Sequence, residues 1–147
     1  MGELEEELRL RLKLVDLNYL KQHEGIEQDR LRKLTKEIQD DGMLKKAIAV
    51  DASTFVVIDG HHRLNALRLL GCKKIPVCFI DYSSPLVEVS TWTSERKITK
   101  QTVIEAAKNG SKLPPRTTRH LIKIGKDKVK HIAYIEKDVN ISLEKLS

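Results

Sequence analysis

A run of ionisable side chains follows a short apolar stretch near the middle of the chain: Asp59, Gly60, His61, His62 and Arg63. Glycine permits a tight turn and lets a ligand approach the backbone closely. If a helix starts here, its first N–H groups lack partners within the helix, and they attract an anion together with the helix dipole. Three potential cations favour the same ligand, and the donor fork of Arg63 suits phosphate. The segment predicts a phosphate-binding turn; the alternative is a helix start with solvated histidines.

Two carboxylates could act on a ligand held at that turn. Glu24 lies in a polar connection, and Gly25 beside it leaves the chain free to approach a ligand. Glu24 could serve as a general base, or it could stabilise the start of the next helix through the helix dipole. Asp59 could orient a reacting hydroxyl or bind Mg²⁺ beside phosphates, or it could stabilise the turn. The residue types leave the choice open for Glu24, and we favour the functional role for Asp59.

A third polar segment follows the stiff pair Pro114–Pro115, and it consists of Thr117, Thr118, Arg119 and His120. Its cations could bind a carboxylate while its hydroxyls add hydrogen bonds; the alternative is a basic surface loop. Trp92 is the one tryptophan of the chain. It could form a wall of a ligand pocket, or it could fill the core.

The hydrophobic pattern predicts the elements that position these groups. Alternating apolar residues indicate strands, and apolar residues at helical spacing, ended by glycine, indicate helices. The expected strands are 8–14, 47–50, 55–58, 75–80, 86–92 and 132–135. The expected helices are 27–41, 61–70, 99–108 and 142–146. This mixed order predicts the α+β class, and residues 1–147 have the size of a single domain.

Composition limits the choice of partners. The net charge of +6 favours anionic ligands, but Lys and Arg are interspersed with Asp and Glu, so nucleic acid is not the expected partner. The two cysteines are too few for a structural zinc site and are expected to be buried thiols. The sequence shows no apolar leader and no run long enough to span a bilayer, so we expect no membrane contact and a cytoplasmic location.

Residues 57–64, Val-Ile-Asp-Gly-His-His-Arg-Leu, resemble the ParB/sulfiredoxin superfamily. The resemblance implies an α+β, ParB/sulfiredoxin-like domain with a small mixed sheet, in which a Gly-x-x-Arg element receives nucleotide phosphates. Sulfiredoxins carry a catalytic cysteine directly after that glycine, whereas this chain has His61. Chromosome-partitioning ParB proteins carry a helix-turn-helix domain further on, and the sequence shows no such pattern.

The chain is more similar to free L-serine kinases. His23-Glu24, the Asp-Gly-His-His-Arg of 59–63 and the Thr-Thr-Arg-His of 117–120 match motifs of that family in order, and Thr91-Trp92 is a weaker match. The resemblance implies phosphoryl transfer from a nucleotide to the hydroxyl of free L-serine, with Glu24 as base. It also implies that Trp92 lines the serine pocket and that the product, phosphoserine, feeds cysteine synthesis.

Within that resemblance, Arg119 and His120 are expected to bind the serine carboxylate, and Mg²⁺ is expected to bind largely through the phosphates. ADP-dependent members are longer between the tryptophan strand and the Thr-Thr-Arg-His motif; here about twenty-five residues separate Trp92 from Thr117. We therefore favour ATP as donor, with ADP as the alternative. The competing hypothesis is a ParB-like nucleotide- or DNA-binding module without kinase activity.

Overall fold

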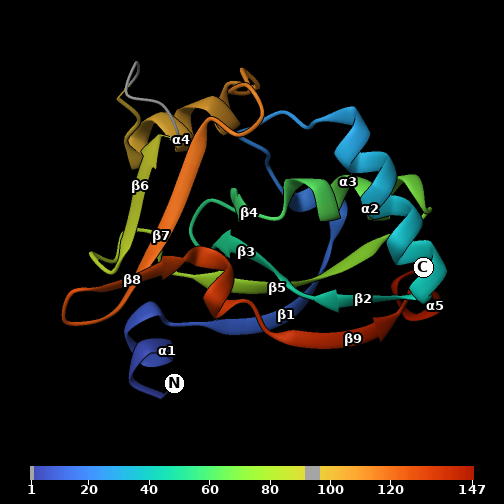
Figure 1. Cartoon of the computed structure of the whole chain (residues 1–147), viewed down its shortest axis with the longest axis horizontal. Coiled ribbons are helices and arrows are strands. Elements are labelled where there is room, and N and C mark those ends of the chain that lie inside the picture. The colour runs from blue at the N-terminus through green and yellow to red at the C-terminus, as the bar shows by residue number, and fades with distance from the viewer. Residues whose placement is uncertain (1, 92–96) are drawn as a thin grey trace.

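A four-stranded mixed sheet, in the order β1-β5-β3-β4, forms the centre of the fold (Figure 1). The computed structural model describes residues 2–91 and 97–147. The strands of this sheet are β1 (Arg11–Asp16), β3 (Ile48–Asp51), β4 (Val57–Asp59) and β5 (Lys74–Ile80). β3 is parallel to β5 and antiparallel to β4, while β1 is antiparallel to β5. β5 has a neighbour on each side and is buried over residues 75–80, which explains its continuous apolar run.

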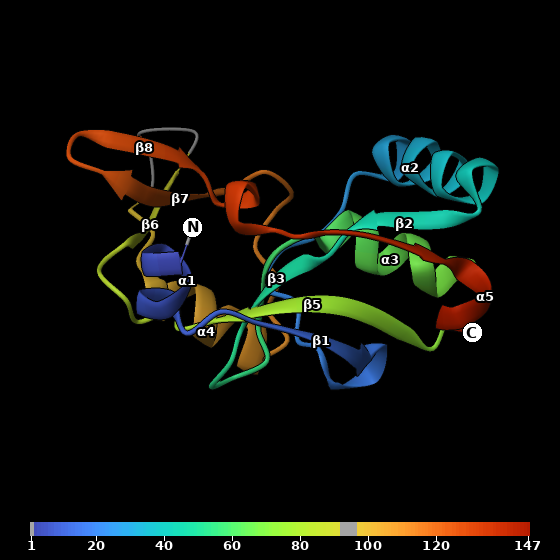
Figure 2. The same cartoon turned by 90° about the horizontal axis from the view of Figure 1, so that it is seen from below.

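Two helices, α2 (Gln28–Asp41) and α3 (His61–Leu69), lie on the same side of β5 (Figure 2). They share one apolar cluster with the sheet, to which α2 contributes Leu31 and Ile38 and α3 contributes Leu64 and Leu67. α2 ends at Gly42, whose left-handed conformation (φ +68°) lets its N–H bind the carbonyl of Ile38. The predicted helices at 27–41 and 61–70 and the two predicted strands between them are confirmed.

A second, three-stranded antiparallel sheet has the order β6-β7-β8. Its strands are β6 (Val87–Thr91), β7 (Thr118–Gly125) and β8 (Lys128–His131). Helix α4 (Lys100–Lys108) lies against this sheet, and Val103, Val87 and Ile122 are buried in a common cluster. Thr99 caps α4 and exchanges hydrogen bonds with Thr102 in a capping box. This confirms the predicted helix at 99–108.

The two ends of the chain are anchored in the fold. At the N-terminus, α1 (Gly2–Leu8) inserts Leu8 into the core. At the C-terminus, β9 (Asp138–Ser142) pairs antiparallel with β2 (Met43–Lys46), and α5 (Leu143–Leu146) follows as predicted. Short 3₁₀ helices η1 (Leu17–Tyr19) and η2 (Ile132–Ile135) complete the element order.

Two sequence-based predictions of strands were wrong. The leucines of 8–14 suggested one strand, but α1 ends at Leu8 and β1 begins at Arg11. β1 is an edge strand on which Leu12 and Leu14 are 48% and 47% exposed, so their alternation does not mark a core-facing side. Residues 132–135 form η2, because Ile132 and Ile135, three residues apart, both reach the core from a 3₁₀ turn. The predicted strand 86–92 is present as β6, and its last residue, Trp92, lies outside the described residues.

Candidate active site

The three polar segments singled out in the sequence meet at the start of α3. The connection that precedes α2 runs beside β4, since the N–H of Val57 donates to the carbonyl of Lys21 at 2.8 Å. The same connection pairs with the loop before β7: the N–H of Gly25 donates to Leu113, and the N–H of Leu113 donates to His23, both at 2.8 Å. In Figure 1 these two loops lie side by side above the start of α3.

Gly60 makes the turn from β4 into α3 possible. Its φ of +113° lies in a region that favours glycine, and a Cβ at this position would lie 2.3 Å from Cγ2 of Ile48. The first hydrogen bond of α3 runs from the N–H of Leu64 to the carbonyl of Gly60, and the side chain of residue 60 supplies no cap. The N–H groups of residues 61–63 therefore precede the helical ladder, in the arrangement that binds anions at helix starts.

The two histidines of the turn are acceptors in this structure, which corrects the view of them as cations. The N–H of His23 donates to Nε2 of His61 at 3.3 Å, and the N–H of Glu27 donates to Nε2 of His62 at 3.0 Å. A ring nitrogen that accepts a hydrogen bond carries no proton, and burial lowers the pKa of both imidazoles. The neutral histidines thus tie the start of α3 to the connection before α2.

Arg63 is bound by acceptors within the fold. Its Nη2 donates to Asp59 at 3.1 Å and to Glu136 at 2.8 Å, and its Nη1 donates to the carbonyl of Ala47 at 2.8 Å. The side chain is 18% exposed. These bonds engage both terminal nitrogens of Arg63, and its contact with phosphate stays a prediction. Glu136, a buried acid that sequence reasoning missed, completes this network.

Positive charge near the turn comes from residues far apart in the sequence. The charges of Arg30 and Arg116 lower the pKa of His62, and that of Lys112 lowers the pKa of His61, in each case after the larger effect of burial. Arg116 also forms an ion pair with Glu27 at 3.0 Å. No motif in the sequence indicated Arg30 or Lys112, because only the fold brings them to the start of α3.

Glu24 is held by the segment that precedes and opens β7. Its Oε1 accepts the N–H of Arg116 at 2.7 Å, and its Oε2 accepts the N–H of Thr118 at 3.2 Å and the Thr118 hydroxyl at 2.5 Å. The carboxylate is 12% exposed. Burial raises its pKa, and the negative charge of Asp59 adds to the rise, while the bonds from Thr118 and Arg116 oppose it. A fixed carboxylate with a raised pKa is suited to take a proton.

The Thr-Thr-Arg-His segment is divided by the alternation of β7. Thr118 and His120 point to one face and Arg119 to the other, where it is exposed. His120 is buried, its Nε2 lies 2.8 Å from the hydroxyl of Tyr82, and burial holds its pKa well below the usual value. The prediction that His120 binds a substrate carboxylate conflicts with this position. The hydroxyl of Thr117 donates to the carbonyl of Pro114.

His23, which the sequence indicated only as half of a His-Glu pair, joins two of the site segments. Its Nδ1 lies 2.8 Å from the carbonyl of Val57, and its Nε2 lies 3.1 Å from the hydroxyl of Thr118. Its ring contacts those of His61 and His120 edge-on. Burial lowers its pKa to about 4, so the imidazole is neutral at physiological pH.

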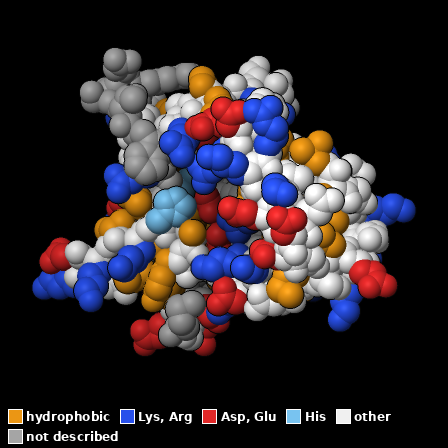
Figure 3. All heavy atoms as spheres, turned by 45° about the vertical axis from the view of Figure 1, so that its right-hand side comes forward, with side chains coloured by type: hydrophobic (Ala, Val, Ile, Leu, Met, Phe, Trp, Pro, Cys, Tyr) orange, Lys and Arg blue, Asp and Glu red, His pale blue; other side chains and the backbone are white. Residues whose placement is uncertain are grey.

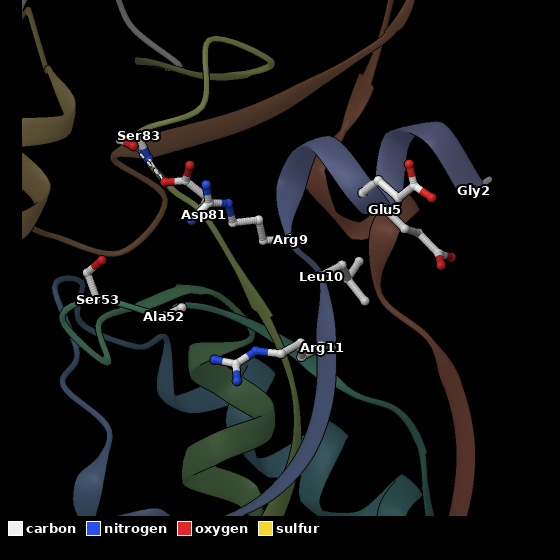
Figure 4. Close-up of a pocket in the computed structure, with 10 residues that line it drawn as sticks. Gly2, Glu5, Arg9, Leu10, Arg11, Ala52, Ser53, Asp81 and Ser83 are labelled. Carbon is white, nitrogen blue, oxygen red and sulfur yellow. Dashed lines mark hydrogen bonds between the residues drawn. The ribbon is translucent and has the colours of Figure 1, made fainter.

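The rest of the surface offers less organised chemistry. On the side shown in Figure 3, Lys, Arg, Asp and Glu side chains are intermixed. A cavity of about 840 Å³ lies between α1 and the loops after β3 and β5, lined among others by Arg9, Arg11, Ser53 and Asp81 (Figure 4). None of the predicted site residues lines it.

Residues 2–91 and 97–147 lack two kinds of feature. No group of three or more His, Cys, Asp or Glu side chains is arranged there to hold a metal ion. No helix in this part of the chain combines the length and apolar character needed to cross a bilayer.

Comparison with known proteins identifies the family. The model of the ParB N-terminal domain matches residues 2–89, so the chain belongs to that family. An ATP-dependent L-serine kinase of Staphylothermus marinus is 37% identical over 83 residues, which are 54% of this chain and 33% of the relative. The ADP-dependent L-serine kinase SerK of Thermococcus kodakarensis is 30% identical over 98 residues, which are 64% of this chain and 40% of the relative. The chain thus spans between a third and two fifths of the length of these relatives.

Among solved structures, a free serine kinase in complex with AMP is similar with a TM-score of 0.78. The likeness covers 92% of this chain and 93% of that one, at 18% identity. It therefore extends beyond the family match of residues 2–89, and it establishes the fold. The α+β prediction and the resemblance to this family are confirmed.

Proposed function

We propose that residues 1–147 act as a single domain that transfers a phosphoryl group from a nucleotide to the hydroxyl of free L-serine, giving O-phospho-L-serine. The observation that carries the proposal is that residues 23–27 link two parts of the site. Glu24 is bound by backbone and side chain of the β7 segment, and the N–H groups of His23 and Glu27 bind the two histidines that open α3. An acid beside an anion-binding helix start is the arrangement that phosphoryl transfer to an alcohol requires. The names of the similar kinases support the same reaction.

In this proposal the start of α3 holds the phosphates. The N–H groups of residues 61–63 bind phosphate oxygens, and the nearby charges of Arg30, Arg116 and Lys112 attract the nucleotide. Neutral His61 and His62 hold the helix start in place. The main contribution to rate is the positioning of the two reactants and stabilisation of charge on the transferred group.

Glu24 takes the proton of the serine hydroxyl as that oxygen attacks the phosphorus. A general base typically contributes about 10²–10⁴ in rate. Arg119 is proposed to bind the serine carboxylate, with Thr117 adding a hydrogen bond; Trp92, outside the described residues, keeps its proposed place beside the substrate. His120, which is buried, is proposed to support this site.

In this proposal, Mg²⁺ would be bound by one protein carboxylate together with the phosphates of the nucleotide. Asp59 is the carboxylate next to the phosphate turn, its side chain is 26% exposed, and Mg²⁺ in kinases is often bound by one or two carboxylates plus phosphates. When bound, the ion would neutralise phosphate charge. A cytoplasmic location and the supply of phosphoserine to cysteine synthesis are further proposals, which rest on the resemblance to serine kinases.

Incubation with Mg²⁺, L-serine and either ATP or ADP tests the proposal, with O-phosphoserine detected by ³¹P NMR. We expect product with ATP; product with ADP alone would reassign the donor. A ParB-like binding module is the second candidate, because the family match concerns that domain. It predicts no product with either nucleotide and salt-sensitive binding to DNA.

A further inference from the structure

The tautomer of His23 follows from its contacts. Nδ1 lies 2.8 Å from the carbonyl oxygen of Val57, which can only accept, so Nδ1 carries the ring proton. The imidazole is neutral, because burial lowers its pKa to about 4. Nε2 therefore has no proton and can only accept a hydrogen bond.

The hydroxyl of Thr118 lies between two acceptors. Its Oγ1 is 2.5 Å from Oε2 of Glu24 and 3.1 Å from Nε2 of His23. A hydroxyl has one proton, so it cannot donate to both groups at once. While Glu24 is ionised, one of the two acceptors lacks its hydrogen bond. One additional proton, placed on Oε2 of Glu24, would complete a hydrogen-bond chain from Glu24 through Thr118 to His23.

The groups around this hydrogen-bond chain do not supply that proton. The rings of His61 and His120 lie 4.6 Å and 5.7 Å from that of His23, between ring centroids, and burial keeps both neutral. Asp59 acts on Glu24 and on His23 through its charge alone.

Arg116 offers Glu24 its backbone N–H, while its guanidinium is paired with Glu27. The N–H of Thr118 also faces Oε2, and Nε2 of neutral His23 lies 3.9 Å from the same oxygen. The Thr118 hydroxyl is therefore the group that responds to the charge of Glu24.

We propose that Thr118 is a hydroxyl switch that couples the protonation of Glu24 to neutral His23, an inference that rests on the proposed kinase reaction. Before transfer, the hydroxyl donates to ionised Glu24. As the serine O–H bond breaks, its proton forms a bond to Oε2 of Glu24, which then donates to Oγ1 of Thr118. The Thr118 proton turns to Nε2 of His23. No proton moves onto the imidazole, and the serine oxygen keeps the electron pair with which it attacks phosphorus.

The hydrogen-bond chain is complete only after the serine proton has reached Glu24. Thr118 and His23 thereby stabilise the state that follows proton abstraction more than the state that precedes it, which is the requirement for a contribution to catalysis. Both are positioning residues, since they act through Glu24. This role differs from the substrate contact that the sequence suggested for Thr118.

Matched variants separate the switch from a simple structural role. His23→Asn can still donate to Val57 from the Nδ1 position but lacks the Nε2 acceptor, whereas His23→Gln can accept at the Nε2 position. Thr118→Val removes the hydroxyl at nearly constant shape, and Thr118→Ser retains it. The Cδ resonance of Glu24, assigned with Glu24→Gln, is titrated by ¹³C NMR in each protein, and the acidic limb of kcat is measured in parallel.

We expect opposite shifts from the two residues. In His23→Asn the hydroxyl is free to donate to Glu24 permanently, so the pKa of Glu24 and the acidic limb fall by roughly half to one pH unit. In Thr118→Val ionised Glu24 loses a hydrogen-bond donor, so the pKa of Glu24 and the acidic limb of kcat rise by a similar amount. His23→Gln and Thr118→Ser should titrate like the wild type. In the Thr118→Val background, His23→Asn should cause no further shift.

The outcomes distinguish this inference from the proposed function. If His23→Asn leaves the titration of Glu24 unchanged, or shifts it equally with and without the Thr118 hydroxyl, the switch is refuted even if the enzyme forms phosphoserine. If the wild type forms no phosphoserine, the kinase proposal fails, while the NMR titration still reports on the hydrogen-bond chain. If His23→Asn does not fold, the comparison of Thr118→Val with Thr118→Ser tests the switch. A pKa of Glu24 in Thr118→Val equal to that of the wild type would refute it.

Discussion

At the scale of single residues, the site is built from buried groups whose charge depends on their partners. Glu24 is nearly enclosed and yet keeps three hydrogen bonds, so it is fixed in position and its pKa is raised. The imidazoles of His61 and His120 lie edge-on against that of His23, the neighbour of Glu24, and all three are buried and neutral. These imidazoles contribute to the fold through their hydrogen bonds and their packing rather than through positive charge.

Replacing Glu24 by glutamine tests the base directly. The amide would keep the size of the side chain and an oxygen for one of the N–H donors, but it cannot take a proton. We expect kcat for serine phosphorylation to fall by about 10²–10⁴, with a smaller change in nucleotide affinity. Turnover and nucleotide titration calorimetry measure the two effects. Full turnover in this variant would remove Glu24 from its proposed role.

The buried histidines make stability depend on pH. The pKa of His120 is lowered in the folded state, so below about pH 6.5 the unfolded chain binds a proton that the folded chain does not. Its contribution to stability is complete above pH 6.5 and is lost as pH falls. The raised pKa values of Glu24 and Glu136 act in the opposite direction, so a comparison with a variant is required.

His120→Gln isolates this effect while retaining an acceptor for Tyr82. We expect the slope of unfolding free energy against pH to be smaller in the variant, by about 0.7 kcal/mol per pH unit at pH 6.5 and by about 1.4 kcal/mol per pH unit at pH 5. Urea denaturation at several pH values between 5 and 8 provides the slopes. Parallel curves for the two proteins would show that His120 is protonated in the folded state.

At the scale of elements, the junction of β4 and α3 depends on the absence of a side chain at residue 60. Gly60→Ala would place a methyl group against Ile48, in a backbone conformation that already disfavours alanine. We expect a loss of stability of several kcal/mol and weaker nucleotide binding, because the helix start must move. Urea denaturation and calorimetry measure both.

Gly71→Ala is the matched control for that variant. Gly71 also has a left-handed conformation (φ +78°), but nothing lies within 4 Å of its added Cβ. We expect it to cost only about 1–2 kcal/mol, from the backbone conformation alone, and to leave nucleotide affinity unaffected. Equal losses in the two variants would mean that the contact with Ile48 is not important.

At the scale of the whole molecule, the last residues of the chain hold the first half together. Leu146 is fully buried, its carbonyl accepts the N–H of Lys73 at 2.8 Å, and β9 pairs with β2 at the end of α2. Although α5 has a single turn, it closes the core beneath α2 and α3. The C-terminus is therefore part of the scaffold that places the α3 turn.

Leu146→Ala should be far more destabilising than its position near the chain end suggests. We expect a loss of about 2–5 kcal/mol, as for other buried leucines. Leu69→Ala is the matched control, because that leucine is 65% exposed and should cost less than about 0.5 kcal/mol. Thermal and urea denaturation of both variants give the comparison. Similar small losses would indicate that the C-terminal turn is dispensable.

Local patterns in the sequence were sufficient for most elements. Gly42 and the apolar spacing of 27–41 defined α2, Thr99 defined the start of α4, and Gly60 marked the turn into α3. These signals are local, since a cap, a turn or a helical face depends on neighbours a few residues apart. The edge strand β1 was misjudged because exposure depends on the position of a strand within its sheet.

Which groups bind one another was decided only by the tertiary structure. The pairs Glu24–Thr118 and Arg63–Glu136 join residues 94 and 73 positions apart, and no local pattern encodes such contacts. The same holds for charge: His61 and His62 suggest cations in the sequence, but burial and backbone donors make them neutral acceptors. Desolvation and hydrogen bonding set the protonation state of a side chain, and both arise when distant segments come together.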